Sequence, residues 1–155
     1  MPRIAIISDS HGSVENAYAF RDRIGRVDAL YHLGDHTDDA EELAQILNCG
    51  YVAVRGNCDP FSSYPLIEVI EWDGTRILLL HGHSVSGRLN LRLLAEQEHA
   101  NVVLFGHSHV PSIETVDGIL MINPGSLSLP RTSKGPSMCV LTLCGTSRNA
   151  ELFFL

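Results

Sequence analysis

The segment Gly106-His107-Ser108-His109 places two histidines one residue apart, directly after the apolar run Asn101–Phe105. Imidazole is a common protein ligand for borderline transition metals. A glycine after a short strand lets the chain turn so that both imidazoles face one point. Because histidine pairs also occur in loops without any role, this pattern indicates a metal site only if other segments supply ligands to the same place.

Four further apolar runs end in the same way, in a small residue and a potential metal ligand. They are Ile4–Ser8 before Asp9 and His11, Leu30–Leu33 before Asp35, Val52–Arg55 before Asn57, and Ile77–Leu80 before His81 and His83. In an open α/β sheet, ligands bind beyond the carboxyl ends of the strands. The mixed oxygen and nitrogen ligands exceed the four that a structural zinc takes, and they suit two metal ions about 3.5–4 Å apart.

The first 60 residues predict alternating strands and helices. The expected strands are 3–8, 29–33 and 51–54. The expected helices run from a cap at Ser13 to about residue 26, and from about residue 38 to about Asn48, with Gly50 as the stop signal. Alternation of this kind is typical of a parallel sheet with right-handed crossovers.

The remaining sequence predicts mainly antiparallel pairs. Asp73-Gly74 and Asp117-Gly118 are hairpin signals between apolar runs, and 137–143 and 150–154 form a last expected pair. A helix over 87–98 and a strand over 101–105 lie between the hairpins. The whole chain, residues 1–155, therefore predicts one domain of the α/β class: a four-layer αββα sandwich of two mixed sheets packed face to face with flanking helices.

Composition limits the classes of partner. The net charge of −7 disfavours nucleic acid and anionic membranes as partners, although bound metal would reverse the charge locally for an anionic substrate. No run approaches the 18 apolar residues of a membrane span, the first apolar run is too short for a signal peptide, and the four cysteines form no CxxC pair. These features predict a cytoplasmic protein with reduced thiols.

The motif order DxH, GD, GNCD, HGH, GHSH resembles the calcineurin-like metallophosphoesterase superfamily, and in particular the small bacterial and archaeal phosphodiesterases of the YfcE type. The resemblance also covers the later segment Asn123–Ser126. It implies one metal held by Asp9, His11, Asp35 and His109, and a second held by Asn57, His81 and His107, with Asp35 shared between the two. The implied reaction is hydrolysis of a small-molecule or nucleotide-like phosphodiester by a metal-bridging hydroxide. Manganese is the expected metal, with nickel, iron, cobalt or zinc as alternatives.

Beside the metal ligands, the expected catalytic residues are Asp35, Asn57 and His83, and the expected substrate-binding residues are Cys58 and Arg131. Cys58 stands where many superfamily members have histidine after GN, and a thiol is a poor match for a general acid. Water or His83 could supply that proton. His83 and Arg131 are about equally well interpreted as ordinary loop residues.

Four other positions have a structural interpretation. His32 is expected to be a packed core histidine, Arg55 to form a structural ion pair, and Asp59 to cap the turn before Pro60 rather than to hydrogen-bond the active-site loop. The acidic run Asp38–Glu42 is expected to be a solvated helix start.

The competing function is a non-catalytic protein-binding scaffold of the same fold. A retromer subunit involved in vacuolar sorting resembles this family and is regarded mainly as such a protein-binding module. A scaffold has no need of all seven ligands, and here the set is complete. A metal-dependent nuclease is disfavoured by the charge. A homo-oligomer, dimer or tetramer, stays possible, and specificity is expected in the loops 61–65, 85–88 and 127–134.

Overall fold

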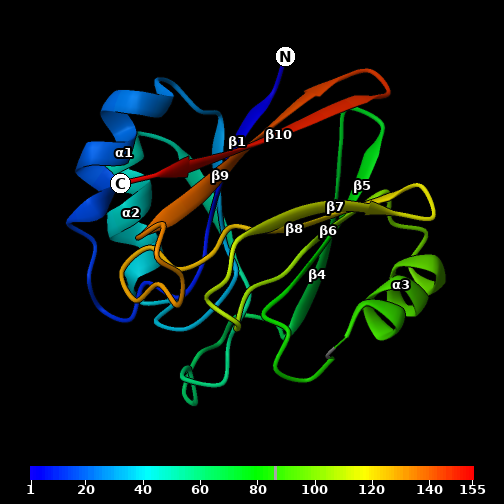
Figure 1. Ribbon diagram of the computed structural model, residues 1–155, viewed down its shortest axis with the longest axis horizontal. Helices are drawn as coiled ribbons and strands as arrows, with labels where there is room; N and C mark the ends of the chain where they lie inside the picture. Colours follow the sequence, from blue (N-terminus) through cyan, green and yellow to red (C-terminus); the bar gives the residue numbers. More distant parts are fainter. Residues whose placement is uncertain (86) are drawn as a thin grey trace.

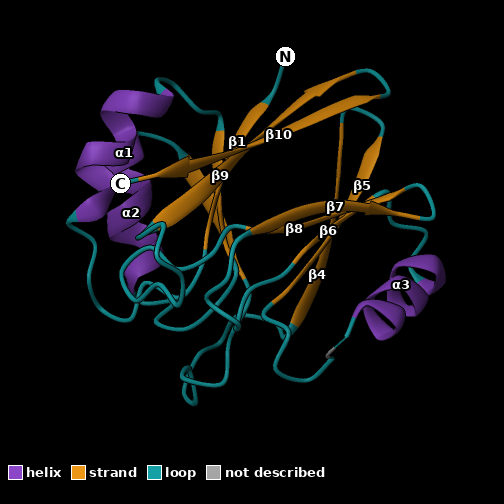
Figure 2. Cartoon of the chain, in the orientation of Figure 1, coloured by secondary structure: helices purple, strands orange, loops and turns teal. Residues whose placement is uncertain are grey.

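Two five-stranded sheets lie face to face between helices in the computed structural model (Figures 1 and 2). The structure describes residues 1–85 and 87–155, so Ser86, within the expected specificity loop 85–88, lies outside the described residues. Helices α1 (Asn16–Ile24) and α2 (Asp39–Leu47) cover one sheet, and α3 (Arg88–Gln97) covers the other. The predicted αββα sandwich is confirmed.

The first sheet has the strand order β10-β9-β1-β2-β3 and the second has β4-β5-β6-β8-β7. The strands of the first are β1 (Arg3–Ile7), β2 (Ala29–His32), β3 (Gly50–Ala53), β9 (Ser137–Cys144) and β10 (Ser147–Phe154). Those of the second are β4 (Ile67–Trp72), β5 (Thr75–Leu80), β6 (Val102–Leu104), β7 (Ser112–Val116) and β8 (Ile119–Asn123).

Each sheet combines parallel and antiparallel pairs. Strands β1, β2 and β3 are parallel, and β9 pairs antiparallel with the free side of β1 through contacts such as Ala5 opposite Val140. Strands β5, β6 and β8 are parallel, with β4 and β7 antiparallel at the two edges. The last strand pair thus returns to the N-terminal sheet instead of extending the second one, because β1 offers an unpaired edge there.

Apolar side chains fill three layers. Along β1, Ile4 and Ile6 point between the sheets, whereas Ala5 and Ile7 point toward α1 and α2, as alternation along a strand requires. On the far side, Leu78 and Leu80 pack with Leu91 and Ala95 of α3. Strands buried on both faces explain the continuous apolar runs of the sequence.

The start of α1 differs from the expectation, whereas the end of α2 agrees with it. Ser13 does not cap α1, which begins at Asn16 without a side-chain cap; its hydroxyl donates to Glu15 instead, 2.5 Å away. Helix α2 ends at Leu47 with Asn48 as its cap, which agrees with the expected end at about Asn48, and Gly50 begins β3. Asn48 adopts the left-handed conformation, with φ of 55° and ψ of 51°, which asparagine tolerates better than most residues.

We expect Asn48→Ala to lower the free energy of unfolding by about 1 kcal/mol, because alanine has no local polar contact that offsets a left-handed backbone. Asn48→Gly should be neutral or slightly stabilising. Thermal denaturation should show Tm lower by about 2–4 °C for the alanine variant. Equal Tm values for the two variants would contradict this account of the helix end.

The carboxyl ends of β1, β2, β3, β5 and β6 lead into the five segments that carry the candidate ligands. Parallel pairing within each sheet directs these ends to one edge of the sandwich (Figure 1). Among the described residues, no helix is both long and apolar enough to span a membrane.

Candidate metal centre

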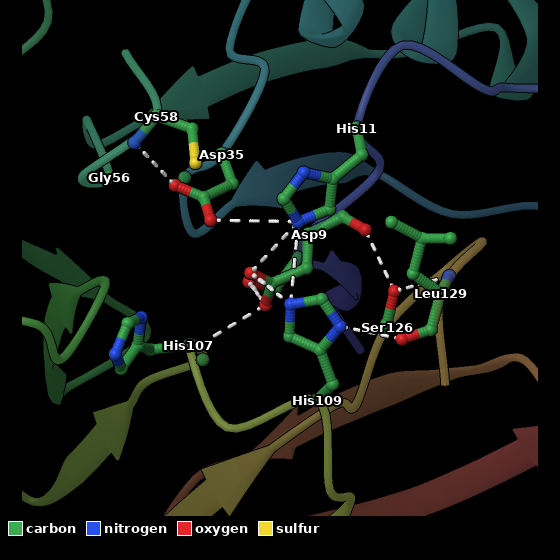
Figure 3. A network of polar contacts seen from close by, with 12 residues as sticks. Asp9, His11, Asp35, Gly56, Cys58, His107, His109, Ser126 and Leu129 are labelled. Atoms are coloured by element: carbon green, nitrogen blue, oxygen red, sulfur yellow. Dashed lines mark hydrogen bonds and ion pairs between the residues drawn. The ribbon is translucent and has the colours of Figure 1, made fainter. Parts of the chain in front are cut away.

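Asp9, His11, Asp35 and His109 meet at this edge (Figure 3). Each of the four offers one oxygen or nitrogen atom, and these atoms all lie within 4.8 Å of one another. Asp9, Asp35 and His109 are buried, and His11 is half-buried. The four side chains come from three loops that are far apart in sequence, so their convergence is a product of the sheet topology.

One carboxylate oxygen of Asp9, Oδ1, is buried and has no hydrogen-bond partner among the described residues. Its other oxygen, Oδ2, accepts from the Ser8 hydroxyl at 2.6 Å and from the backbone N–H of His107 at 3.1 Å. Around Oδ1 lie the Nε2 atoms of His109 at 3.2 Å and of His11 and His81, each at 3.7 Å. A buried carboxylate oxygen facing three imidazoles is costly unless a cation lies between them.

Two of these imidazoles have their lone pairs aimed at the carboxylates. Nδ1 of His81 lies 2.8 Å from the carbonyl oxygen of Leu33, and Nδ1 of His109 lies 2.5 Å from that of Leu129. A carbonyl oxygen can only accept a hydrogen bond, so Nδ1 carries the proton in both rings. The lone pair of Nε2 is then free to bind a metal ion. Metal-binding histidines almost always have this arrangement, in which the second nitrogen is anchored to an acceptor.

Asp35 lies between His11 and His81. Its Oδ1 accepts from the backbone N–H of Cys58 at 2.9 Å, and its Oδ2 lies 3.4 Å from Nε2 of His81 and 3.6 Å from Nε2 of His11. Burial by itself would raise the pKa of Asp35, but the neighbouring His81 and the backbone amide of Cys58 hold that pKa well below its usual range. Asp35 is therefore a carboxylate, as a metal ligand must be.

Backbone strain is concentrated at the same residues. Five candidate ligands have φ between 48° and 73°: Asp9, His11, Asp35, His107 and His109. Residues other than glycine rarely adopt such angles, and clusters of them mark functional sites. Close loop contacts add a further constraint, because a Cβ on Gly56 would lie 2.2 Å from Oδ1 of Asp35.

These observations fit a divalent cation. The donor set combines two carboxylates with imidazole nitrogens, which suits manganese, iron, cobalt, nickel or zinc better than calcium. Nε2 of His11 and Nε2 of His109 lie only 3.3 Å apart, an approach that a shared cation would stabilise. The structure therefore contains a possible metal site made of Asp9, His11, Asp35 and His109.

The other candidate ligands, His81, His107 and Asn57, lie around this four-residue site. Nδ1 of His107 is 3.2 Å from Nε2 of His81, and the same Nε2 atom lies 3.4 Å from Oδ2 of Asp35. Asn57 is exposed, and the contact described for its side chain runs from Nδ2 to Sγ of Cys58, at 3.7 Å. His81 and His107 are thus brought to the group, and Asn57 lies on the neighbouring loop without a described contact to it.

Residues 2–146 match the family model described as the calcineurin-like phosphoesterase superfamily domain. The chain belongs to the calcineurin-like phosphoesterase superfamily. It is 38% identical over 144 residues to the probable metallophosphoesterase YsnB of Bacillus subtilis, covering 90% of this chain and 83% of that protein. It is also 34% identical over 100 residues to the phosphodiesterase YfcE of Escherichia coli, covering 59% of this chain and 52% of YfcE.

Among solved structures, a predicted phosphoesterase from Streptococcus pneumoniae superposes with a TM-score of 0.81 at 33% identity, covering 99% of this chain and 89% of that one. The family model, the relatives and the metal site agree on one class of enzyme. This member of the calcineurin-like phosphoesterases is a metal-dependent hydrolase of phosphate esters.

The phosphoesterase uses Asp59 in a way that the sequence interpretation did not favour. Asp59 is buried, and its Oδ2 accepts from the backbone N–H groups of Asp35 and Gly56, both at 2.8 Å. Its Oδ1 accepts from the backbone N–H groups of His36 at 2.7 Å and Thr37 at 2.9 Å. Asp59 therefore closes its own turn through Gly56, and it also forms the alternative contact, to the active-site loop: it holds the Asp35 loop against the loop that carries Asn57.

Asp39 corrects a second expectation. The run 38–42 was expected to be a solvated helix start, but Oδ2 of Asp39 accepts from the Ser10 hydroxyl at 2.7 Å and from the backbone N–H of Gly12 at 2.8 Å. Ser10 lies between two candidate ligands, so Asp39 fixes the loop from Asp9 to His11. No periodicity or spacing in the sequence indicates these contacts.

The segment Asn123–Ser126, noted in the sequence only as part of the resemblance, also supports both ligand loops. The Asn123 side chain donates from Nδ2 to the Ser108 hydroxyl at 3.0 Å and to the carbonyl oxygen of Gly106 at 3.3 Å. The Ser126 hydroxyl donates to the carbonyl oxygen of Asp9 at 2.8 Å (Figure 3). A chain segment from β8 thus ties the loop after β6 to the loop after β1.

The candidate substrate-binding residues lie around the opening of the site. His83, Cys58 and Arg131 are all exposed; the ring of His83 lies 5.5 Å from that of His81, and the backbone N–H of Arg131 donates to the carbonyl oxygen of His109 at 3.3 Å. Arg55 forms no ion pair among the described residues and donates instead to the carbonyl oxygen of Tyr64.

His32 is fully buried, as expected, and its hydrogen bonds define its protonation. The backbone N–H of Gly34 donates to Nδ1 at 3.1 Å, so Nε2 carries the proton and donates to the Ser10 hydroxyl at 3.0 Å. The Ser10 hydroxyl in turn donates to Asp39. Burial lowers the pKa of His32 to about 4.

This pKa predicts a loss of stability in acid. Because unfolded His32 has a pKa near 6.5, the unfolded state takes up a proton first, and stability falls as the pH drops from about 6.5 toward about 4. In the metal-free protein, we expect the wild type to lose about 2 kcal/mol more than His32→Asn between pH 7 and pH 5. Urea denaturation at both pH values measures the difference, and equal losses would contradict the buried neutral histidine.

Proposed function

We propose that this phosphoesterase hydrolyses small-molecule or nucleotide-like phosphodiesters with two divalent metal ions, manganese being the first candidate. The observation that carries the proposal is Oδ1 of Asp9, a buried carboxylate oxygen that has no hydrogen-bond partner among the described residues and faces three imidazole nitrogens. The name of YfcE, a phosphodiesterase, supports the class of substrate.

The proposed ligands divide into two sets that share Asp35. Asp9, His11, Asp35 and His109 would hold one ion, and Asp35, Asn57, His81 and His107 would hold the other. When bound, such a centre supplies Lewis acidity and a nucleophile at neutral pH. Two carboxylates against two divalent cations leave a net charge of about +2, which attracts a phosphate to a protein whose overall charge is −7.

The chain's own residues orient these groups and limit the proton chemistry. The carbonyl oxygens of Leu33 and Leu129 fix the rings of His81 and His109. Burial, together with the nearby charge of Asp35, raises the pKa of the Cys58 thiol, which makes it a weak acid toward a departing oxygen. We therefore expect diesters with stable leaving groups to be hydrolysed fastest, and monoesters more slowly.

The test combines metal analysis of the purified protein with hydrolysis of a chromogenic phosphodiester and the matching monoester. Each assay is run after chelation and after return of manganese, nickel, zinc or magnesium. We expect about two metals per chain, diesterase activity that chelation abolishes, and recovery that is best with manganese. A protein with neither metal nor activity would contradict the proposal and favour the scaffold function.

A further inference from the structure

An apolar hollow adjoins the candidate metal centre on the side of the second sheet. It has a volume of about 150 Å³ and lies between the loop after β5, the first turns of α3 and the loop after β6. The apolar side chains lining it are Val85, Leu91 and Phe105, and Gly106 and His107 also line it. The hollow and the proposed metal centre therefore share the loop that carries His107.

The polar residues that line the hollow have partners elsewhere. His107 lies beside the proposed metal centre, because its backbone N–H donates to Asp9 and its ring adjoins His81. Arg88 forms an ion pair with Glu114, so its charge is already compensated. Ser108 accepts from Asn123 and from the backbone N–H of Val110. An uncharged apolar group fits this space better than a second anion does.

The volume of the hollow limits the size of the group that it can hold. Cavities of about 150 Å³ with leucine, isoleucine and phenylalanine linings hold a benzene molecule. The hollow is open on one side, so a ring can enter while it remains bonded to a phosphorus atom near His107. A phosphodiester has two ester groups, and a hollow beside the metal centre can receive one of them.

We propose that this hollow binds one ester group of the substrate, and that the group is apolar and about the size of a phenyl ring. Val85, Leu91 and Phe105 form its wall, and His107 marks where the phosphate lies. This inference rests on the proposed phosphodiesterase function and adds the chemistry of one substituent. It makes Val85 a residue that determines specificity without any part in the proposed metal centre.

The test uses two phosphonates that contain no ester bond, methylphosphonate and phenylphosphonate, and measures their binding to manganese-loaded protein by calorimetry. We expect the wild type to bind phenylphosphonate about tenfold more tightly, because only the phenyl group reaches the hollow. Val85→Phe fills the hollow and should remove this preference while methylphosphonate binding stays within about twofold. The matched control is Leu89→Phe, an exposed position of α3 outside the hollow, which should keep the preference.

The possible results distinguish failure of the proposed subsite from failure of the proposed phosphodiesterase function. If both phosphonates bind the wild type equally, or if Val85→Phe weakens both to the same extent, the hollow is not a substrate subsite, although the metal centre and its hydrolysis stand. If the manganese-loaded wild type binds neither phosphonate, the subsite fails by itself. If the protein takes up none of manganese, nickel, zinc or magnesium and hydrolyses no diester, the phosphodiesterase proposal fails and the subsite falls with it.

Discussion

Asp35→Asn is expected to abolish phosphodiesterase turnover and to lower metal content, with metal affinity reduced by more than about 100-fold. Loss of an outer hydrogen-bond partner of a metal ligand already costs 10–100-fold, and Asp35 is proposed to be a ligand shared by both ions. The amide keeps the size of the side chain and an oxygen for the backbone N–H of Cys58, but it removes the charge next to His11 and His81.

Metal content by elemental analysis and turnover of a chromogenic diester measure this effect. The control is Asp22→Asn, which changes an exposed carboxylate of α1 whose side chain is 76% exposed and should leave both quantities unchanged. Circular dichroism checks that the Asp35 variant remains folded. Full activity in a folded Asp35→Asn protein would remove Asp35 from the proposed centre.

Asp59→Ala is expected to lower the free energy of unfolding by about 3–5 kcal/mol and to deplete metal as well. Asp59 accepts hydrogen bonds from four backbone N–H groups, those of residues 35, 36, 37 and 56, and the alanine variant leaves them without that acceptor. Buried N–H groups without partners are costly. The Asp35 loop, whose residues 35 and 36 have φ above 60°, loses the contacts that maintain its conformation.

Urea denaturation and metal analysis separate the two parts of this effect. Asp59→Asn retains one carbonyl oxygen and should be intermediate in stability, while Asp22→Ala should resemble the wild type. A stable Asp59→Ala protein with normal metal content would show that Asp59 caps only its own turn, which was the interpretation of the sequence.

Local patterns carried much of the fold prediction. The apolar runs that became β1 and β5 are buried on both faces, and the two Asp-Gly pairs lie in the turns of the β4–β5 and β7–β8 hairpins. Strand identity depends on such neighbouring residues, so it can be inferred from them. The return of β9 and β10 to the first sheet could not be inferred in the same way, because it depends on which strand edge is free after the other elements pack.

The supporting carboxylates show the same limit at the site. Asp39 and Asp59 resemble ordinary helix-start and turn residues in the sequence, and their main contacts lie 20 or more residues away along the chain. Every residue except proline has a backbone N–H group, so a hydrogen bond to that group does not require a particular residue type in the partner segment. A carboxylate in that role therefore cannot be distinguished from a solvated one until the loops are placed.

The sequence by itself determined the family, the sandwich class and the set of candidate ligands, because strands followed by glycine, histidine and aspartate are local patterns and parallel strands end at one edge of a sheet. Only the tertiary structure decided which ligand atoms meet within 4.8 Å, and that an apolar hollow adjoins His107. Distances between loops depend on how two sheets pack against each other, and no single segment of the chain contains that information.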